Sequence, residues 1–100
     1  SSLKQYTCSA VISLPSESVT ALAFARQTWH DKYYLLAIGL ESGKIQINRF
    51  DGHEFQLLGT INNSEAHNLC VNKLEFRPSC EGFFLASCGN DSLVKIYKLS

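Results

Sequence analysis

Alternation of apolar and polar residues dominates the chain. Lys44–Asn48 reads Lys-Ile-Gln-Ile-Asn and Leu93–Tyr97 reads Leu-Val-Lys-Ile-Tyr, so apolar side chains recur at every second position. This period of two is typical of a half-buried strand, and helical periodicity is nearly absent. The pattern predicts an all-β fold with eight strands: Gln5–Leu14, Val19–Phe24, Tyr34–Gly39, Lys44–Phe50, Phe55–Ile61, Val71–Phe76, Phe83–Cys88 and Leu93–Leu99.

Turn-forming residues separate these predicted strands. Proline, glycine, asparagine, aspartate and serine cluster at Pro15-Ser16, Glu41-Ser42-Gly43, Asp51-Gly52, Asn62-Asn63-Ser64, Pro78-Ser79 and Gly89-Asn90-Asp91. These residue types favour tight turns, because they either adopt positive φ angles or bond to the neighbouring backbone. Short connections of this kind join antiparallel strands.

The chain also contains two related halves. Residues 36–47 align with residues 85–96 at a shift of 49, and Val19–Phe24 matches Val71–Phe76 at a shift of 52. A period near 50 residues with four strands per unit is typical of β-propeller blades, since a WD40 repeat of about 40 to 45 residues supplies four strands.

The segment Leu85–Tyr97 resembles the strand-turn-strand pattern of the WD40 family, with Tyr97-Lys98 where the name-giving Trp-Asp usually stands. This resemblance implies two consecutive repeats, residues 1–50 and residues 51–100, that form two four-stranded antiparallel blades. The outer strand of each blade is supplied by the preceding sequence. Because propellers typically need four to eight blades, we expect the chain to be part of one larger propeller.

His67, Ser87, Asp91 and Tyr97 are the candidate polar site of the second repeat. The resemblance implies that they form a buried chain of hydrogen bonds, from the carboxylate to the imidazole, then to the serine hydroxyl and the aromatic tip. A serine, a histidine and a carboxylate could also form a catalytic triad. However, Ser87 lies inside a predicted strand and the sequence lacks the Gly-x-Ser-x-Gly elbow of hydrolases. We therefore expect a structural quartet and no enzyme activity.

The first repeat lacks this quartet. Its corresponding positions are Ile38, Ser42 and Asn48, and no histidine precedes Val19 at the matching place. We therefore expect this degenerate repeat to rely on packing alone.

Cysteine spacing gives no support for a metal site. Cys70, Cys80 and Cys88 with His67 match no standard zinc finger or ribbon, and no Cys-x-x-Cys pair occurs. Together with Cys8 these residues are better explained as reduced thiols. No metal and no cofactor are expected.

Charge and hydropathy exclude further classes of function. Nine Lys and Arg balance nine Asp and Glu, so no long-range electrostatic field attracts nucleic acid, and direct contact with it is expected to be absent or minor. The most apolar run, Tyr33–Leu40, is far shorter than the roughly 20 residues of a membrane-spanning helix. The N-terminal sequence lacks the features of a secretory signal, so a cytoplasmic or also nuclear protein is expected. The candidate partner contacts, all in or near predicted loops, are Trp29, His30, Arg49 and His53.

A more specific resemblance centres on Gly39–Ile45, which reads Gly-Leu-Glu-Ser-Gly-Lys-Ile. With Val19–Leu22 and Ala66-His67, it resembles the last two repeats of the WD40 subunit family of the Elongator complex. The resemblance implies a non-catalytic scaffold that holds Elongator subunits together for the modification of wobble uridines in tRNA. Its partners would be the large scaffold subunit and the radical-SAM acetyltransferase-like subunit. The alternative is a peptide-recognition or adaptor module of another complex, such as a ubiquitin ligase.

Overall fold

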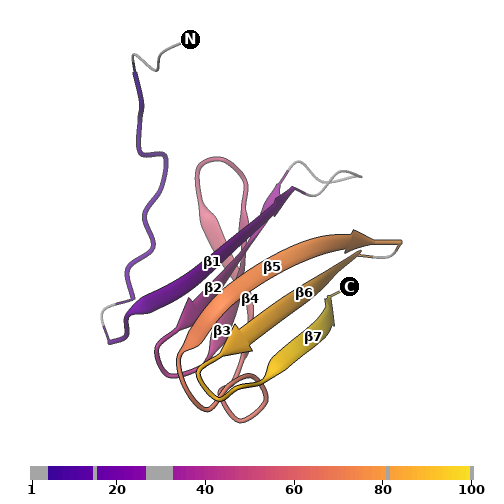
Figure 1. Cartoon of the computed structure of the whole chain (residues 1–100). Coiled ribbons are helices and arrows are strands. Elements are labelled where there is room, and N and C mark those ends of the chain that lie inside the picture. Colours follow the sequence, from indigo (N-terminus) through magenta and orange to yellow (C-terminus); the bar gives the residue numbers. More distant parts are fainter. Residues whose placement is uncertain (1–4, 15, 27–32, 81, 100) are drawn as a thin grey trace.

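The computed structural model describes residues 5–14, 16–26, 33–80 and 82–99. Within these residues the chain is all-β, as predicted, with seven strands in two antiparallel sheets (Figure 1). Sheet A has the order β1-β2-β3-β4 and sheet B the order β5-β6-β7. The strands are β1 (Val19–Arg26), β2 (Tyr34–Leu40), β3 (Ile45–Phe50), β4 (Phe55–Ile61), β5 (Val71–Ser79), β6 (Gly82–Gly89) and β7 (Val94–Leu99). No helix long and apolar enough to cross a membrane occurs among the described residues.

Two features of this architecture differ from the sequence prediction. Sheet A has four strands, but its fourth is β4, which pairs with β3 and was expected in the second blade, whereas sheet B has three strands within the described part of the chain. Residues 5–14, predicted as a strand, form none, and Tyr6 and Val11 on this segment are strongly exposed. Figure 1 shows the segment beside the sheets and outside their strand ladders, with its N-terminal end leading away. Alternation reports only that a segment suits a strand; without a neighbouring strand its backbone has no ladder to join.

The two sheets pack face to face through one core. Sheet A contributes small and β-branched side chains to this core, and sheet B contributes mostly larger ones. The core residues are Ala21, Ala23, Ala37, Ile45, Ile47 and Ile61 from sheet A, Val71, Leu74, Phe76, Leu85, Tyr97 and Leu99 from sheet B, and Ala66 from the connecting loop. The approach is close: a Cβ atom built on Gly39 would lie 2.7 Å from Cγ1 of Val71. A glycine is therefore needed at this contact.

The outward faces of both sheets are also apolar. On sheet A, rings from four strands form a row, with Phe24 stacked on Tyr34 at 5.1 Å and Phe50 stacked on Phe55 at 4.7 Å between centroids. On sheet B, Val94 and Ile96 are 74% and 62% exposed. At a shift of 49 they correspond to Ile45 and Ile47, which sheet B covers in sheet A. Each outward face therefore repeats a pattern that is buried elsewhere in the same chain, as expected of consecutive propeller blades.

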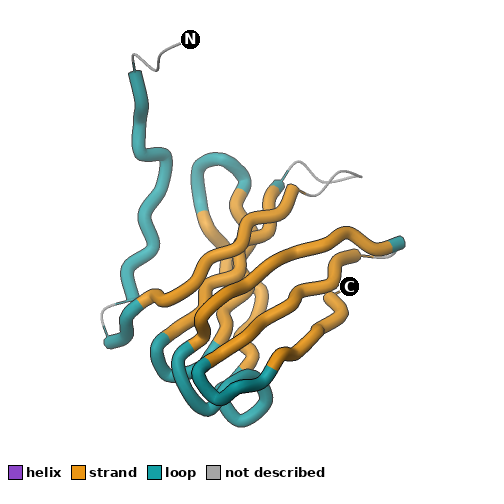
Figure 2. The backbone as a smooth tube through the Cα atoms, viewed as in Figure 1, coloured by secondary structure: helices purple, strands orange, loops and turns teal. Residues whose placement is uncertain are grey.

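The turns that carry the candidate polar residues gather at one end of the sheets. The β2–β3 turn, the β4–β5 loop and the β6–β7 turn lie together there (Figure 2). Backbone hydrogen bonds join them: the amide of His67 donates to the Gly43 carbonyl at 3.2 Å, and the amide of Asn90 donates to the Cys70 carbonyl at 2.9 Å. This end of the molecule holds the site described next.

Candidate functional site

The site is a hydrogen-bonded chain of three side chains from two turns and a strand. His67 comes from the β4–β5 loop, Ser87 from β6 and Asp91 from the β6–β7 turn. Nδ1 of His67 lies 2.9 Å from Oδ1 of Asp91, and its Nε2 lies 2.8 Å from Oγ of Ser87. Because an ionised carboxylate can only accept, Nδ1 donates to Asp91, and in the tautomer with its proton on Nδ1 the other ring nitrogen, Nε2, accepts from the serine hydroxyl.

The backbone also converges on the Asp91 carboxylate. The amide of Asn68 donates to Oδ2 at 3.1 Å and the amide of Leu93 donates to Oδ1 at 3.2 Å. Burial raises the pKa of Asp91, but the hydrogen bonds from His67, Asn68 and Leu93 outweigh it and hold that pKa below its ordinary value of 3.8. The carboxylate is therefore ionised at neutral pH and fastens the β6–β7 turn to the β4–β5 loop.

Solvent has no access to the serine–histidine pair. His67 is 0% exposed and Ser87 is 2% exposed. A nucleophilic serine must meet both a substrate carbonyl and an oxyanion pocket, which this enclosed hydroxyl cannot do. The arrangement is suited to tying loops together and not to acyl transfer.

Tyr97, the fourth member of the predicted quartet, lies at the edge of this chain. Its hydroxyl donates to the Glu65 carbonyl at 3.4 Å, and Nζ of Lys95 donates to the same oxygen at 2.9 Å. Burial raises the pKa of Tyr97, the charges of Asp91 and Glu65 add to the rise, and a hydrogen bond with Ser87 opposes it. The single proton of the tyrosine hydroxyl is thus donated to the loop backbone.

Two glycines make room for the histidine. A Cβ atom on Gly89 would lie 2.8 Å from Nδ1 of His67, and one on Gly43 would lie 1.8 Å from the His67 carbonyl oxygen. Gly43 also has a φ of 98°, a conformation that L side chains rarely adopt. Because Gly43 belongs to sheet A and His67 leads into sheet B, this glycine sets how closely the two units dock.

Sheet A fastens its own turn with a different side chain. The amide of Ser42, which corresponds to Asp91, donates to Oε1 of Glu17 at 3.2 Å, and Glu17 lies in the loop before β1. The expectation that the first repeat relies on packing alone is therefore wrong at this turn. Comparison of the two halves of the sequence missed Glu17, because its carboxylate lies in the loop before the first strand, whereas that of Asp91 lies in the turn itself.

The remaining candidate contacts lie at the opposite end of sheet A or outside the described residues. Arg49 on β3 places its guanidinium 4.5 Å from the centre of the Tyr33 ring. His53 lies in the β3–β4 turn, where its amide and that of Glu54 each donate to Oδ1 of Asp51 at 2.8 Å. Trp29 and His30 fall outside the described residues.

Cysteines are dispersed over the described part of the chain. Cys8 and Cys80 are exposed, Cys70 and Cys88 are half-buried, and all four are free thiols. Within the described residues no group of three or more His, Cys, Asp or Glu side chains is placed to hold a metal ion.

Comparison with known proteins gives the family. A model of the "Anaphase-promoting complex subunit 4 WD40 domain" matches residues 27–100. The chain is similar to Elongator complex protein 2 of Drosophila melanogaster, at 43% identity over 101 residues that cover 99% of this chain and 13% of that protein. It is also similar to Elongator complex protein 2 of Mus musculus, at 30% identity over 117 residues that cover 93% of this chain and 14% of that protein. The chain thus spans only a small part of the length of these relatives. Because the matching model covers most of the chain and describes the fold seen in its two sheets, the chain belongs to the WD40-domain family of anaphase-promoting complex subunit 4.

Proposed function

We propose that this chain is part of a non-catalytic WD40 scaffold subunit of the Elongator complex. The observation that carries the proposal is its 43% identity, over 99% of its length, to a protein named Elongator complex protein 2. The similarity to the mouse protein of the same name supports it.

The polar site supports a scaffolding role. His67, Ser87 and Asp91 are held to one another and to the backbone, and His67 and Ser87 are closed to solvent. Their effect is to hold the β4–β5 loop and the β6–β7 turn in a fixed arrangement at one end of the sheets. A rigid scaffold that presents loops is well suited to recognition of other proteins.

The proposed division of labour in the complex follows from this role. In this proposal the chemistry on the wobble uridines of tRNA belongs to the radical-SAM acetyltransferase-like subunit. This chain helps to hold that subunit and the large scaffold subunit together, in the cytoplasm and also in the nucleus. Direct contact with tRNA is minor, because acidic and basic residues balance over the chain.

Affinity purification tests the proposal. The intact protein, tagged and purified gently from its own cells, should bring down the large scaffold subunit and the radical-SAM subunit in stoichiometric amounts by mass spectrometry. Their absence would overturn the Elongator assignment while leaving the WD40 fold in place. A different, reproducible set of partners would instead favour an adaptor role in another complex.

A pair of matched variants tests which end of sheet A faces the partners. Arg49→Ala with His53→Ala removes two candidate contacts near the β3–β4 turn, whereas Asn63→Ala changes an exposed residue at the opposite end of β4. We expect the first variant to lower recovery of the partner subunits at unchanged thermal stability, and the control to leave recovery unchanged. Equal recovery with both variants would exclude this end as a contact.

A further inference from the structure

The side chain of Asn48 has a buried donor without an acceptor. Asn48 lies on β3 and is 4% exposed, yet its Nδ2 has no hydrogen-bond partner among the described residues. Buried amide groups are nearly always paired, because an unpaired one loses its bonds to water and gains nothing in return. An orphaned donor in this position calls for an acceptor.

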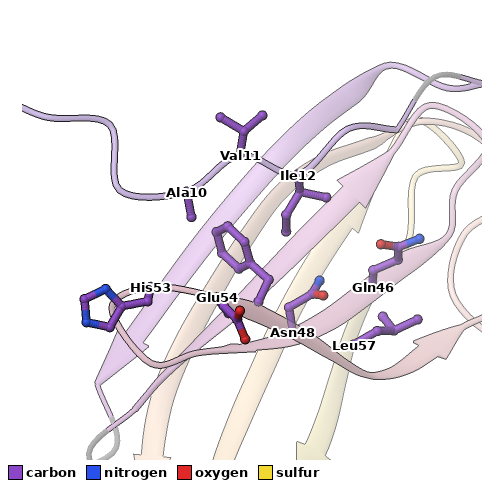
Figure 3. Close-up of a pocket in the computed structure, with 9 residues that line it drawn as sticks. Ala10, Val11, Ile12, Gln46, Asn48, His53, Glu54 and Leu57 are labelled. Atoms are coloured by element: carbon purple, nitrogen blue, oxygen red, sulfur yellow. The ribbon is translucent and has the colours of Figure 1, made fainter.

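The donor borders a cavity that lies under an extended segment of the same chain. This cavity of about 560 Å³ is lined on one side by Gln46 and Asn48 of β3 and on the other by Ala10, Val11 and Ile12. Figure 3 shows the two amide side chains extending from β3 towards the segment, with Ala10 and Ile12 directed at the sheet and Val11 directed away. The segment has the alternation of a strand but no hydrogen bond to the sheet in this arrangement.

The second half of the chain shows which acceptor belongs there. At a shift of 49, Gln46 and Asn48 correspond to Lys95 and Tyr97. Both of those side chains donate to one main-chain oxygen, the carbonyl of Glu65, at 2.9 and 3.4 Å. Glu65 lies six residues before β5, and the residue six positions before β1 is Ser13.

We propose that residues 10–14 form a strap that seats on the outward face of sheet A, with Nδ2 of Asn48 donating to the main-chain carbonyl of Ser13. Gln46 supplies the second donor to this carbonyl. Because the amide of Asn48 is shorter than the ring of Tyr97, the strap lies closer to β3 than the β4–β5 loop lies to β7.

The apolar surface beside Asn48 fits the same occupant. A second cavity of about 430 Å³ lies between Ser9 and Ala10 of the segment and an apolar wall made of Leu22, Ala23, Phe24, Leu36, Phe50 and Phe55. Seating the strap brings the inward side chains of Ala10 and Ile12 onto this wall. The hydrogen bond fixes the register of the strap, and burial of these side chains adds a favourable hydrophobic contribution.

Nuclear magnetic resonance of the intact, unmodified chain tests the proposal directly. The side-chain amide protons of Asn48 should show nuclear Overhauser contacts to Ser13 and Leu14 and should exchange slowly with water. Absence of these contacts, with rapid exchange of the amide protons, would overturn it. This measurement needs no substitution and so does not depend on the folding of a variant.

Limited proteolysis with a matched pair of variants gives a second test. Asn48→Leu removes the donor to the strap, and Tyr97→Phe removes the corresponding donor in sheet B. Thermolysin cleavage within residues 10–14 should be about two- to ten-fold faster in Asn48→Leu, the factor that one hydrogen bond provides, and unchanged in Tyr97→Phe. Equal cleavage in both variants and in the unmodified chain would overturn the proposal, as would equal acceleration in both. Asn48→Gln, which keeps the donor, should restore part of the protection.

Discussion

The β2–β3 turn of sheet A and the β6–β7 turn of sheet B share one backbone design. Three hydrogen bonds from a backbone amide to a backbone carbonyl recur in both turns. In sheet A, Leu40 donates to Lys44 at 3.0 Å, Gly43 to Leu40 at 3.0 Å and Glu41 to Ser18 at 3.0 Å. In sheet B, Gly89 donates to Leu93 at 3.3 Å, Ser92 to Gly89 at 3.2 Å and Asn90 to Cys70 at 2.9 Å. The fourth residue of each turn has a positive φ, 98° at Gly43 and 67° at Ser92. The repeat is therefore a repeat of backbone geometry.

The side chains that secure these two turns differ. In sheet B the carboxylate of Asp91 belongs to the turn and is held by His67 from the preceding loop. In sheet A the carboxylate of Glu17 belongs to the preceding loop and accepts from the backbone of the turn. Either arrangement ties the turn to the loop before the first strand. A repeat can thus lose its characteristic polar residues and keep the fastening that those residues provide.

Substitution at Gly43 should have the largest effect, because this residue joins the two units. In Gly43→Val the new Cβ would overlap the His67 carbonyl, and the positive φ would be strained as well. The turn must then move and take the His67 segment with it. We expect a loss of at least about 4 kcal/mol in the free energy of unfolding, measured by urea titration.

Gly52 provides the matched control for Gly43. It has a similar φ of 101°, but no atom lies within 4 Å of the position that its Cβ would occupy. Gly52→Val should therefore show only the backbone strain, about 1 to 3 kcal/mol. Equal losses at the two positions would mean that the contact with His67 contributes nothing.

The two fastenings can be compared by removing the side chain that each loop contributes. His67→Ala leaves the buried hydroxyl of Ser87 without its acceptor and should cost roughly 1 to 3 kcal/mol, whereas Asp91 keeps its hydrogen bonds from the Asn68 and Leu93 amides. Glu17→Ala removes one half-buried hydrogen bond and should cost about 0.5 to 1.5 kcal/mol. Thermal unfolding of both variants measures the difference. An unchanged melting temperature in His67→Ala would contradict a stabilising role for the buried site.

Acid should weaken the sheet B fastening. The pKa of Asp91 in the folded chain lies below its ordinary value of 3.8, so the carboxylate stabilises the fold fully above that value. This stability is lost as the pH falls through the lower, folded pKa. Urea unfolding of the unmodified chain and of Asp91→Asn, measured from about pH 6 to about pH 3, should show a smaller acid-induced loss in the variant. Parallel curves would show that Asp91 does not contribute to the pH dependence.

The sequence predicted local features of the chain better than contacts between distant segments. Alternation and turn residues placed β2 at Tyr34–Gly39, and the structure extends it by one residue to Leu40. The same alternation over residues 5–14 wrongly predicted a strand, because alternation contains no information about whether a partner strand is available. The family pattern named His67, Ser87 and Asp91, which the structure brings within hydrogen-bonding distance. No such pattern marked Glu17. It accepts a hydrogen bond from the turn as Asp91 does, but from the loop before β1, and sheet B has no carboxylate at the corresponding position.

The smallest effect should come from making the two turns more alike. Ser92 holds a φ of 67° with a side chain, whereas Gly43 meets the equivalent requirement without one. Ser92→Gly relieves the left-handed strain, of about 1 to 2 kcal/mol, but raises the conformational entropy of the unfolded chain, which offsets part of this relief, so a net gain of about 0.5 to 1 kcal/mol is expected. Thermal unfolding should show a rise of a few degrees. A loss of stability would mean that the Ser92 side chain makes a favourable contribution larger than its strain, and that the two turns, alike in backbone, have diverged at this position as well.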